Sequence, residues 1–200
     1  TNGYYKDRTD MMKAIIKKQR ALIAEVYGSA NAVAQVYVAY DDLGERYNDG
    51  VNALLAQEDY DDIIVMWAND SYGYVRQTPN ANEQKREGGS GIYYHTSYMG
   101  WGGERKSYLF LNSLPIQQMN EQMHRAYDCG MQSYWILNVG DLKPGDILAQ
   151  YFIEMGWDIN NYLDTGVHDF LVNWCVKQYA MTQADAESVA CAIEEFYNLT

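Results

Sequence analysis

The sequence predicts an α/β protein made of parallel (β/α) barrel-type units, about half of a TIM-like barrel, followed by C-terminal helices. Four apolar stretches typical of strands start near residues 34, 63, 91 and 133. Helical patterns or long polar segments separate them at spacings of roughly 30 to 40 residues, which is typical of βα units in a parallel sheet. A closed barrel needs eight such units. The chain is therefore either a small open α/β domain or about half of a barrel.

The first elements follow from hydrophobic periodicity. Apolar residues recur every three or four positions from Arg8 to Tyr27, and Gly28 stands where a helix would end. Residues 32–40 are rich in β-branched and aromatic side chains, which favours a strand. A second helix is expected over residues 41–57, although two glycines weaken it.

The clearest buried strand spans residues 62–70, where five apolar residues in a row are followed by polar ones. The polar, Gly-rich segment 77–91 predicts a loop with one short helical turn. The remaining predicted elements are a strand at 91–98, a helix at 115–130, a strand at 133–140, a helix at 145–158, and helices around 164–180 and 183–198.

Charge and composition exclude several classes of function. The formal net charge is −12 and the pI is near 4.5, so the chain repels nucleic acid and anionic membranes. No run approaches the roughly 18 apolar residues of a membrane span. The three cysteines are widely spaced and form no CxxC pair, which predicts free thiols. A chain that opens on Thr1 without a charged and apolar leader is expected to be processed or to be a piece of something longer.

Polar side chains follow three of the predicted strands at the point where each strand ends. In parallel α/β folds, the carboxyl ends of the strands are where ligands bind. The residues concerned are Asn69, Asp70, Tyr72 and Arg76 after the second strand, His95, Ser97 and Tyr98 after the third, and Asn138, Gly140, Asp141 and Lys143 after the fourth. Each alone could be a turn or cap residue, but three sets at one rim indicate a site.

Asp70 and Asp141 form a candidate pair for general acid and base catalysis, the arrangement that glycoside hydrolysis requires. Arg76, Arg105 and Lys143 suit a ligand that carries its own carboxylate. The three histidines lie far apart and no Cys/His cluster has metal-ligand spacing, so no metal and no cofactor is expected.

Several motifs, in order, carry a family resemblance: "DDIIVMWANDSYGYVR", "GGSGIYYHTSYMG", "LNSLPIQQMNEQMHRAYDCG" and "WILNVGDLKPGD". Together they resemble glycoside hydrolase family 115, the xylan α-glucuronidases, from about Arg8 to the C-terminal helices. The resemblance implies an inverting hydrolase, secreted or periplasmic, that removes glucuronic acid or its 4-O-methyl form from xylan side chains. It also implies that residues 1–160 are part of a (β/α) barrel catalytic domain and residues 161–200 a helical extension.

The resemblance assigns roles to the strand-end residues. Asp141 and Asp70 would be the acid and base, in an order that the sequence leaves open. Trp67 would line the pocket, and Arg76, Arg105 and Lys143 would meet the uronate. The expected contacts of the sugar are Asn69, Tyr72, His95, Tyr98 and Asn138. Asn69 stands where the family usually has an Asp, and Glu104 where many members have Pro, which leaves Arg105 less firmly assigned.

Two alternatives remain at this point: a non-catalytic carbohydrate-binding domain, and a hydrolase of another acidic glycan. The expected partner is glucuronoxylan or a related acidic oligosaccharide. Half a barrel also leaves two open sheet edges, which natural proteins avoid. We therefore expect either the remaining domains of a longer parent chain or a homodimer to cover those edges.

Overall fold

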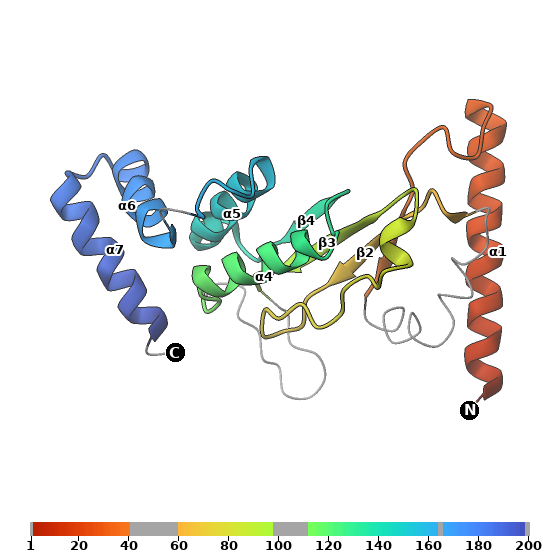
Figure 1. Cartoon of the computed structure of the whole chain (residues 1–200), viewed down its shortest axis with the longest axis horizontal. Helices are drawn as coiled ribbons and strands as arrows, with labels where there is room; N and C mark the ends of the chain where they lie inside the picture. Colours follow the sequence, from red (N-terminus) through yellow and green to blue (C-terminus); the bar gives the residue numbers. More distant parts are fainter. Residues whose placement is uncertain (1, 41–59, 98–111, 164–165, 199–200) are drawn as a thin grey trace. The chain divides into compact units, whose positions relative to one another are not determined.

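The computed structural model describes residues 2–40, 60–97, 112–163 and 166–198 of the chain. The elements are α1 (Asn2–Tyr27), β1 (Val36–Ala39), β2 (Ile64–Ala68), the 3-10 turn η4 (Glu83–Lys85), β3 (Ser90–His95), α4 (Ile116–Asp128), β4 (Trp135–Asn138), α5 (Leu142–Trp157), α6 (Gly166–Tyr179) and α7 (Gln183–Asn198) (Figure 1). The helix predicted over 41–57 lies outside the described residues. No described helix combines the length and apolar character that crossing a bilayer demands.

The strands form one sheet in the order β1-β2-β3-β4, which is also their order along the chain. β1 pairs with β2 in parallel, with Val36 opposite Ile64 and Ala39 opposite Trp67. A doubly wound sheet would reverse its strand order at a switch point, whereas successive barrel units add each new strand on the same side. The predicted fold class, parallel barrel-type units followed by helices, is confirmed.

The chain divides into two compact units. Unit 1 comprises Thr1–Ala68, Gln77–Ile92 and Cys129–Tyr134, and unit 2 comprises Asn69–Arg76, Tyr93–Asp128 and Trp135–Thr200. The sequence suggested another boundary, at residue 160, between a barrel domain and a helical extension. The two compact units do not test that boundary, and it stays a prediction.

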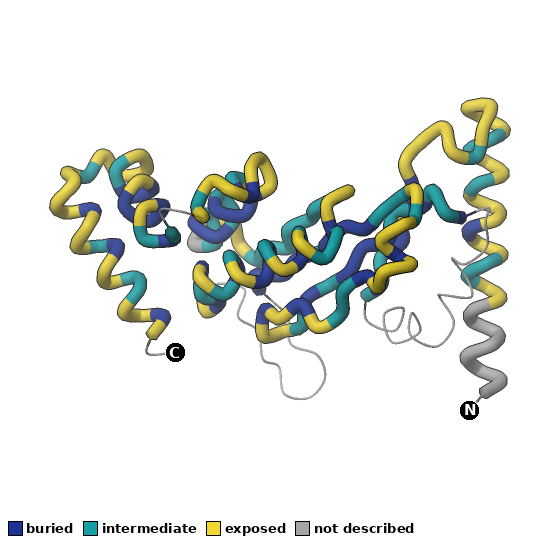
Figure 2. The backbone as a smooth tube through the Cα atoms, viewed as in Figure 1, coloured by how far each residue is buried: buried dark blue, intermediate teal, exposed yellow. Residues whose placement is uncertain are grey.

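In unit 1, α1 ends as its sequence predicts. Gly28 has a φ of +86° and its N–H donates to the carbonyl of Ala24 at 2.9 Å, a conformation in which glycine avoids the strain of a side chain. Arg20 joins α1 to the segment before β2 through an ion pair with Asp62 at 3.0 Å. Val65 and Met66 of β2 are fully buried, as expected for a strand covered on both faces. Figure 2 shows buried and intermediate residues along this strand.

Gly91 of β3 allows another part of unit 1 to approach closely. A Cβ at this position would lie 2.1 Å from the carbonyl oxygen of Tyr134 and 2.4 Å from the sulfur of Met66. Both distances are far inside van der Waals contact, so the strand packs here only without a side chain.

In unit 2, aromatic side chains make much of the core. Tyr151 of α5 packs edge-on against Phe170 of α6 with ring centroids 4.7 Å apart, and Tyr94 of β3 stacks near Phe152 of α5 at 6.4 Å. Such pairs stabilise beyond the area they bury. The core therefore holds the end of β3 and the helices α5 and α6 together, and His95 of β3 and Lys143 of α5 belong to this part of the fold.

Candidate active site

Asn69 and His95 lie together at the carboxyl ends of β2 and β3. The Asn69 amide nitrogen donates to the His95 carbonyl at 2.9 Å, and the His95 N–H donates to Asn69 Oδ1 at 2.7 Å. Both residues are 3% exposed. The Asn69 side chain thus makes the donor and acceptor contacts with His95 that a neighbouring strand's backbone would make. An amide at position 69 supplies both groups.

The same contact sets the state of the His95 ring. Ring nitrogen Nδ1 lies 3.0 Å from Asn69 Oδ1. Because the amide orientation is fixed by the backbone of His95, Oδ1 is an acceptor and Nδ1 must carry the proton. Burial lowers the pKa of His95 to about 4, against a smaller opposing effect of a backbone hydrogen bond with Tyr93. The imidazole is therefore neutral near pH 7.

Tyr93 links His95 to the end of β4. Its ring lies 4.2 Å from the His95 ring, centroid to centroid, and its hydroxyl accepts a hydrogen bond from the Asn138 amide at 2.7 Å. The Asn138 carbonyl in turn accepts from the N–H of Thr96 at 3.0 Å. The polar ends of β2, β3 and β4 that the sequence singled out are thus brought together through Asn69, His95 and Asn138.

Asp70 organises the loop that follows β2. Its Oδ1 accepts from the N–H groups of Tyr72 and Tyr74, both at 2.9 Å, and its Oδ2 contacts Arg76 Nε at 2.5 Å. Both carboxylate oxygens therefore have partners inside the loop. The Tyr72 side chain is 73% exposed.

Two glutamines of helix α4 also hold the loop that follows β2. Gln122 Oε1 accepts from the Val75 N–H at 2.9 Å, and Gln118 donates to the Tyr72 carbonyl at 2.7 Å. The sequence reasoning missed both glutamines. Gln122 is 2% exposed and lies on the apolar face of α4, between Met119 and Met123. A polar residue inside an apolar helical stripe is the signal that could have identified it.

Asp141 and Lys143 precede the regular part of α5. Asp141 has extended backbone, is exposed, and its side chain makes no capping hydrogen bond with the described residues of the helix. Lys143 is also extended, with φ −111° and ψ 117°, as steric clash with a following proline demands. Lys143 forms an ion pair with Asp146, and this hydrogen bond raises the pKa of its ammonium group.

Trp67, which the sequence placed in the pocket, lies in β2 and belongs to unit 1. It is 3% exposed, and its indole N–H donates to Ser90 Oγ at 3.3 Å. Its place in the pocket stays a prediction. Tyr98 and Arg105 lie outside the described residues.

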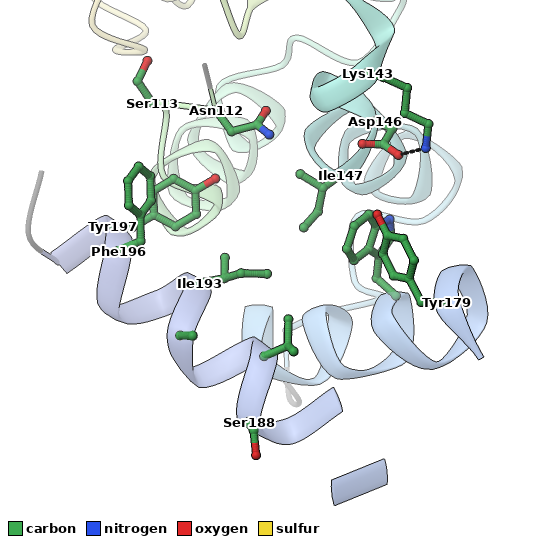
Figure 3. A pocket seen from close by; sticks show the side chains of 13 residues that line it. Asn112, Ser113, Lys143, Asp146, Ile147, Tyr179, Ser188, Ile193, Phe196 and Tyr197 are labelled. Atoms are coloured by element: carbon green, nitrogen blue, oxygen red, sulfur yellow. Dashed lines mark hydrogen bonds and ion pairs between the residues drawn. The ribbon is translucent and has the colours of Figure 1, made fainter. Parts of the chain in front are cut away.

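A cavity of about 1030 Å³ lies next to Lys143 in unit 2 (Figure 3). Its walls are mostly apolar side chains of α5, α6 and α7, with the Lys143–Asp146 ion pair on one side. Asp70, His95, Asn138 and Asp141 do not line it. Of the strand-end residues named in the sequence, Lys143 lines this cavity, whereas these four lie outside its lining.

The strand ends present neutral amide, imidazole and phenol groups beside carboxylates and cations. Such a set can hydrogen-bond the hydroxyls of a sugar and transfer protons. Among the described residues, the group of His, Glu and Cys side chains close enough to hold a metal ion lies elsewhere, on α6 and α7.

Comparison with known proteins gives the family. The model of glycosyl hydrolase family 115 matches residues 2–200. The chain belongs to glycoside hydrolase family 115. The resemblance that the motifs carried is thereby confirmed, and no curated protein matches the chain.

Solved structures agree, and 11 chains match. One is described as a family GH115 4-O-methyl-α-glucuronidase with specificity for decorated arabinogalactans. It shares 31% sequence identity with this chain at a TM-score of 0.86, over 98% of this chain and 24% of that one. This member of family 115 thus spans about a quarter of the length of the solved relative.

Proposed function

We propose that the protein acts as a glycoside hydrolase that removes glucuronic acid or 4-O-methylglucuronic acid side chains from a plant polysaccharide. The observation that carries this is the family match over residues 2–200, together with the likeness to a 4-O-methyl-α-glucuronidase. The cluster of Asn69, His95 and Asn138 supports it, because buried neutral donors and acceptors suit sugar hydroxyls. We further propose that it acts outside the cytoplasm, secreted or periplasmic.

The proposed mechanism is inverting. A carboxylic acid protonates the leaving oxygen while a carboxylate activates water on the opposite face of the sugar. Asp141 is proposed as one of the two groups, with the order of acid and base left open, because its exposed side chain makes no capping hydrogen bond with the described residues of α5. Asp70 is the proposed second group. It would serve the reaction while its three hydrogen bonds hold the loop of Tyr72 to Arg76.

Arg76 and Lys143 are the residues proposed to bind the carboxylate of the uronate. Arg76 contacts Asp70 through Nε, and within the described residues no hydrogen bond engages its two terminal nitrogens. Its side chain is 66% exposed, so these donors can grip a carboxylate from solvent. Lys143, also mostly exposed, supplies a second positive charge.

Two polymers are candidate substrates. The motifs suggest decorated xylan, whereas the solved relative has specificity for decorated arabinogalactans. The test is to incubate the protein, with any sequence that flanks this chain in the gene, with each polymer and measure released uronic acid. NMR of the first product should show the inverted anomer. Release from neither polymer, with binding of glucuronic acid-bearing oligosaccharides by calorimetry, would instead indicate a non-catalytic carbohydrate-binding protein.

Asp141→Asn provides the residue-level test. Loss of an acid or base typically lowers the rate by about 10²- to 10⁴-fold. Asp158→Asn is the matched control, because Asp158 is an exposed aspartate at the other end of α5. Turnover of Asp141→Asn within about threefold of the parent protein would rule out the assignment.

A further inference from the structure

The His168 ring joins helices α6 and α7, which pack side by side in unit 2 (Figure 1). Its Nε2 lies 2.9 Å from Glu187 Oε1 and its Nδ1 lies 2.8 Å from Glu194 Oε2. The two glutamates are seven residues apart on α7, which places them on the same helix face. The imidazole of α6 is therefore held at both ring nitrogens by α7.

A third donor lies beside this contact. A ring nitrogen of His168, a carboxylate oxygen of Glu187 and the sulfur of Cys191 all lie within 4.8 Å of one another. Cys191 follows Glu187 by one turn of α7, so both point to the same side. No local pattern in the sequence indicates this group, because His168 is remote from Glu187 and Cys191 along the chain.

The chemistry of the three donors suits Zn²⁺, which takes imidazole nitrogen, thiolate sulfur and carboxylate oxygen as ligands. With metal–ligand bonds of about 2.0–2.3 Å, tetrahedral ligands stand roughly 3.5 Å apart. The Nε2–Oε1 distance of 2.9 Å is already within this spacing, whereas the Cys191 sulfur, which lies within 4.8 Å of the other two donors, would have to close in by up to about 1 Å. Glu187 is half exposed and Cys191 exposed, so rotation of their side chains can supply that movement.

Glu194 adds an independent feature. A histidine that binds a metal usually donates its other ring N–H to a carboxylate, which fixes the tautomer and orients the ring. In this protein, the Glu194 carboxylate is the group that accepts from Nδ1 of His168. Nε2 is then the ring nitrogen that faces Glu187 and is available to a metal ion.

We propose that His168, Glu187 and Cys191 form a Zn²⁺ site that links α6 to α7, with Glu194 orienting the imidazole and one coordination position left to water. The ion would replace the proton at Nε2 and that of the Cys191 thiol. Its expected effect is on stability, because it would add metal–ligand bonds between two helices that are otherwise joined by packing and by the contacts of His168 with Glu187 and Glu194. The site is separate from the proposed glucuronidase chemistry.

The competing explanation is that His168 is an imidazolium held between two glutamates with no metal role. The hydrogen bonds from Glu194 and then Glu187 do raise the pKa of His168. A proton and a metal ion compete for the same nitrogen, so metal affinity should fall as the pH drops.

The test is a titration of the metal-free protein with Co²⁺, whose thiolate complexes absorb in the near ultraviolet and whose visible bands report a tetrahedral site. We expect a saturable thiolate band that Zn²⁺ abolishes, and a higher melting temperature with Zn²⁺ than with a chelator. Cys191→Ser should remove the band, and His168→Gln should weaken Co²⁺ binding at least tenfold.

Matched controls separate the proposal from general metal binding. Cys129→Ser removes a different free thiol, and Glu195→Gln removes the neighbouring carboxylate of α7; both should leave the titration unchanged. Glu194→Gln should keep the band but weaken binding by about 10- to 100-fold, as loss of an orienting partner does. No thiolate band, or a band that survives Cys191→Ser, would overturn the site.

Discussion

The amide of Asn69 pairs with both backbone groups of His95 and also meets its ring nitrogen Nδ1. One side chain thus holds the backbone at the end of β3 and fixes the tautomer of the imidazole. Because both residues are buried, water cannot replace these contacts. The relationship makes the candidate site sensitive to single substitutions.

Asn69→Ala should destabilise the protein by about 2–4 kcal/mol. The substitution leaves the buried carbonyl and N–H of His95 without their partner, and each unsatisfied group costs about 1–3 kcal/mol. Urea unfolding gives the free energy. Asn160→Ala is the control: Asn160 is exposed, and its replacement should change stability by less than about 0.5 kcal/mol. Equal effects of the two substitutions would contradict the role given to Asn69.

His95 should make the protein less stable in mild acid. Its pKa in the folded state is about 4, below the unfolded value of 6.5, so the unfolded chain binds the proton more readily. The contribution of His95 is complete above pH 6.5 and is lost as the pH falls toward 4. Between pH 7 and pH 4.5 this amounts to about 2 kcal/mol.

The measurement is urea unfolding at these two pH values for the parent protein and for His95→Gln, which cannot titrate in this range. The difference in unfolding free energy between pH 7 and pH 4.5 should be smaller in the variant. An identical pH dependence would show that His95 is not held neutral in the fold.

Asp70→Asn and Asp141→Asn should separate loop structure from chemistry. Asp141→Asn should lower turnover by about 10²- to 10⁴-fold and leave stability within about 0.5 kcal/mol, because its side chain makes no capping hydrogen bond. Asp70→Asn should lower both turnover and stability, since it removes the ion pair with Arg76. Unfolding curves and uronic acid release measure the two effects. If Asp70→Asn loses stability but keeps turnover within threefold, the second proton-transfer group is another residue.

Gly91→Ala should be strongly destabilising, by more than about 2 kcal/mol, because the new methyl group would collide with the Tyr134 carbonyl and Met66. Gly145→Ala is the matched control. Gly145 lies near the start of α5 with nothing within 4 Å of its Cβ position, so alanine should stabilise the helix by about 0.5–1 kcal/mol. Thermal unfolding distinguishes the two, and a neutral Gly91→Ala would show that β3 is not packed as described.

The fold was largely predictable because its signals are local. The end of α1 at Tyr27 follows from Gly28, and β2 from a run of apolar residues followed by polar ones. The regular part of α5 begins after Lys143, close to the predicted start at residue 145, because a residue before proline stays extended.

The site was predictable only in part. Strand ends indicated that Asn69, His95 and Asn138 would meet, but not how they bond. The hydrogen bond of Trp67 depends on its partner Ser90 in a neighbouring strand, and the role of Gln122 depends on a loop 47 residues away in the chain. Such contacts are set by packing between segments that are distant in sequence, and no local pattern encodes them.

The agreement of strand order with chain order bears on how the protein is made. Each of β2, β3 and β4 joins a sheet whose other members have already been synthesised. At a ribosome that adds about 5–20 residues per second, each of these three strands can dock on the preceding one as it emerges. Within the described sheet, β1 alone has to wait for its first partner to be synthesised. At each later step, the nascent chain exposes an unpaired apolar strand only briefly.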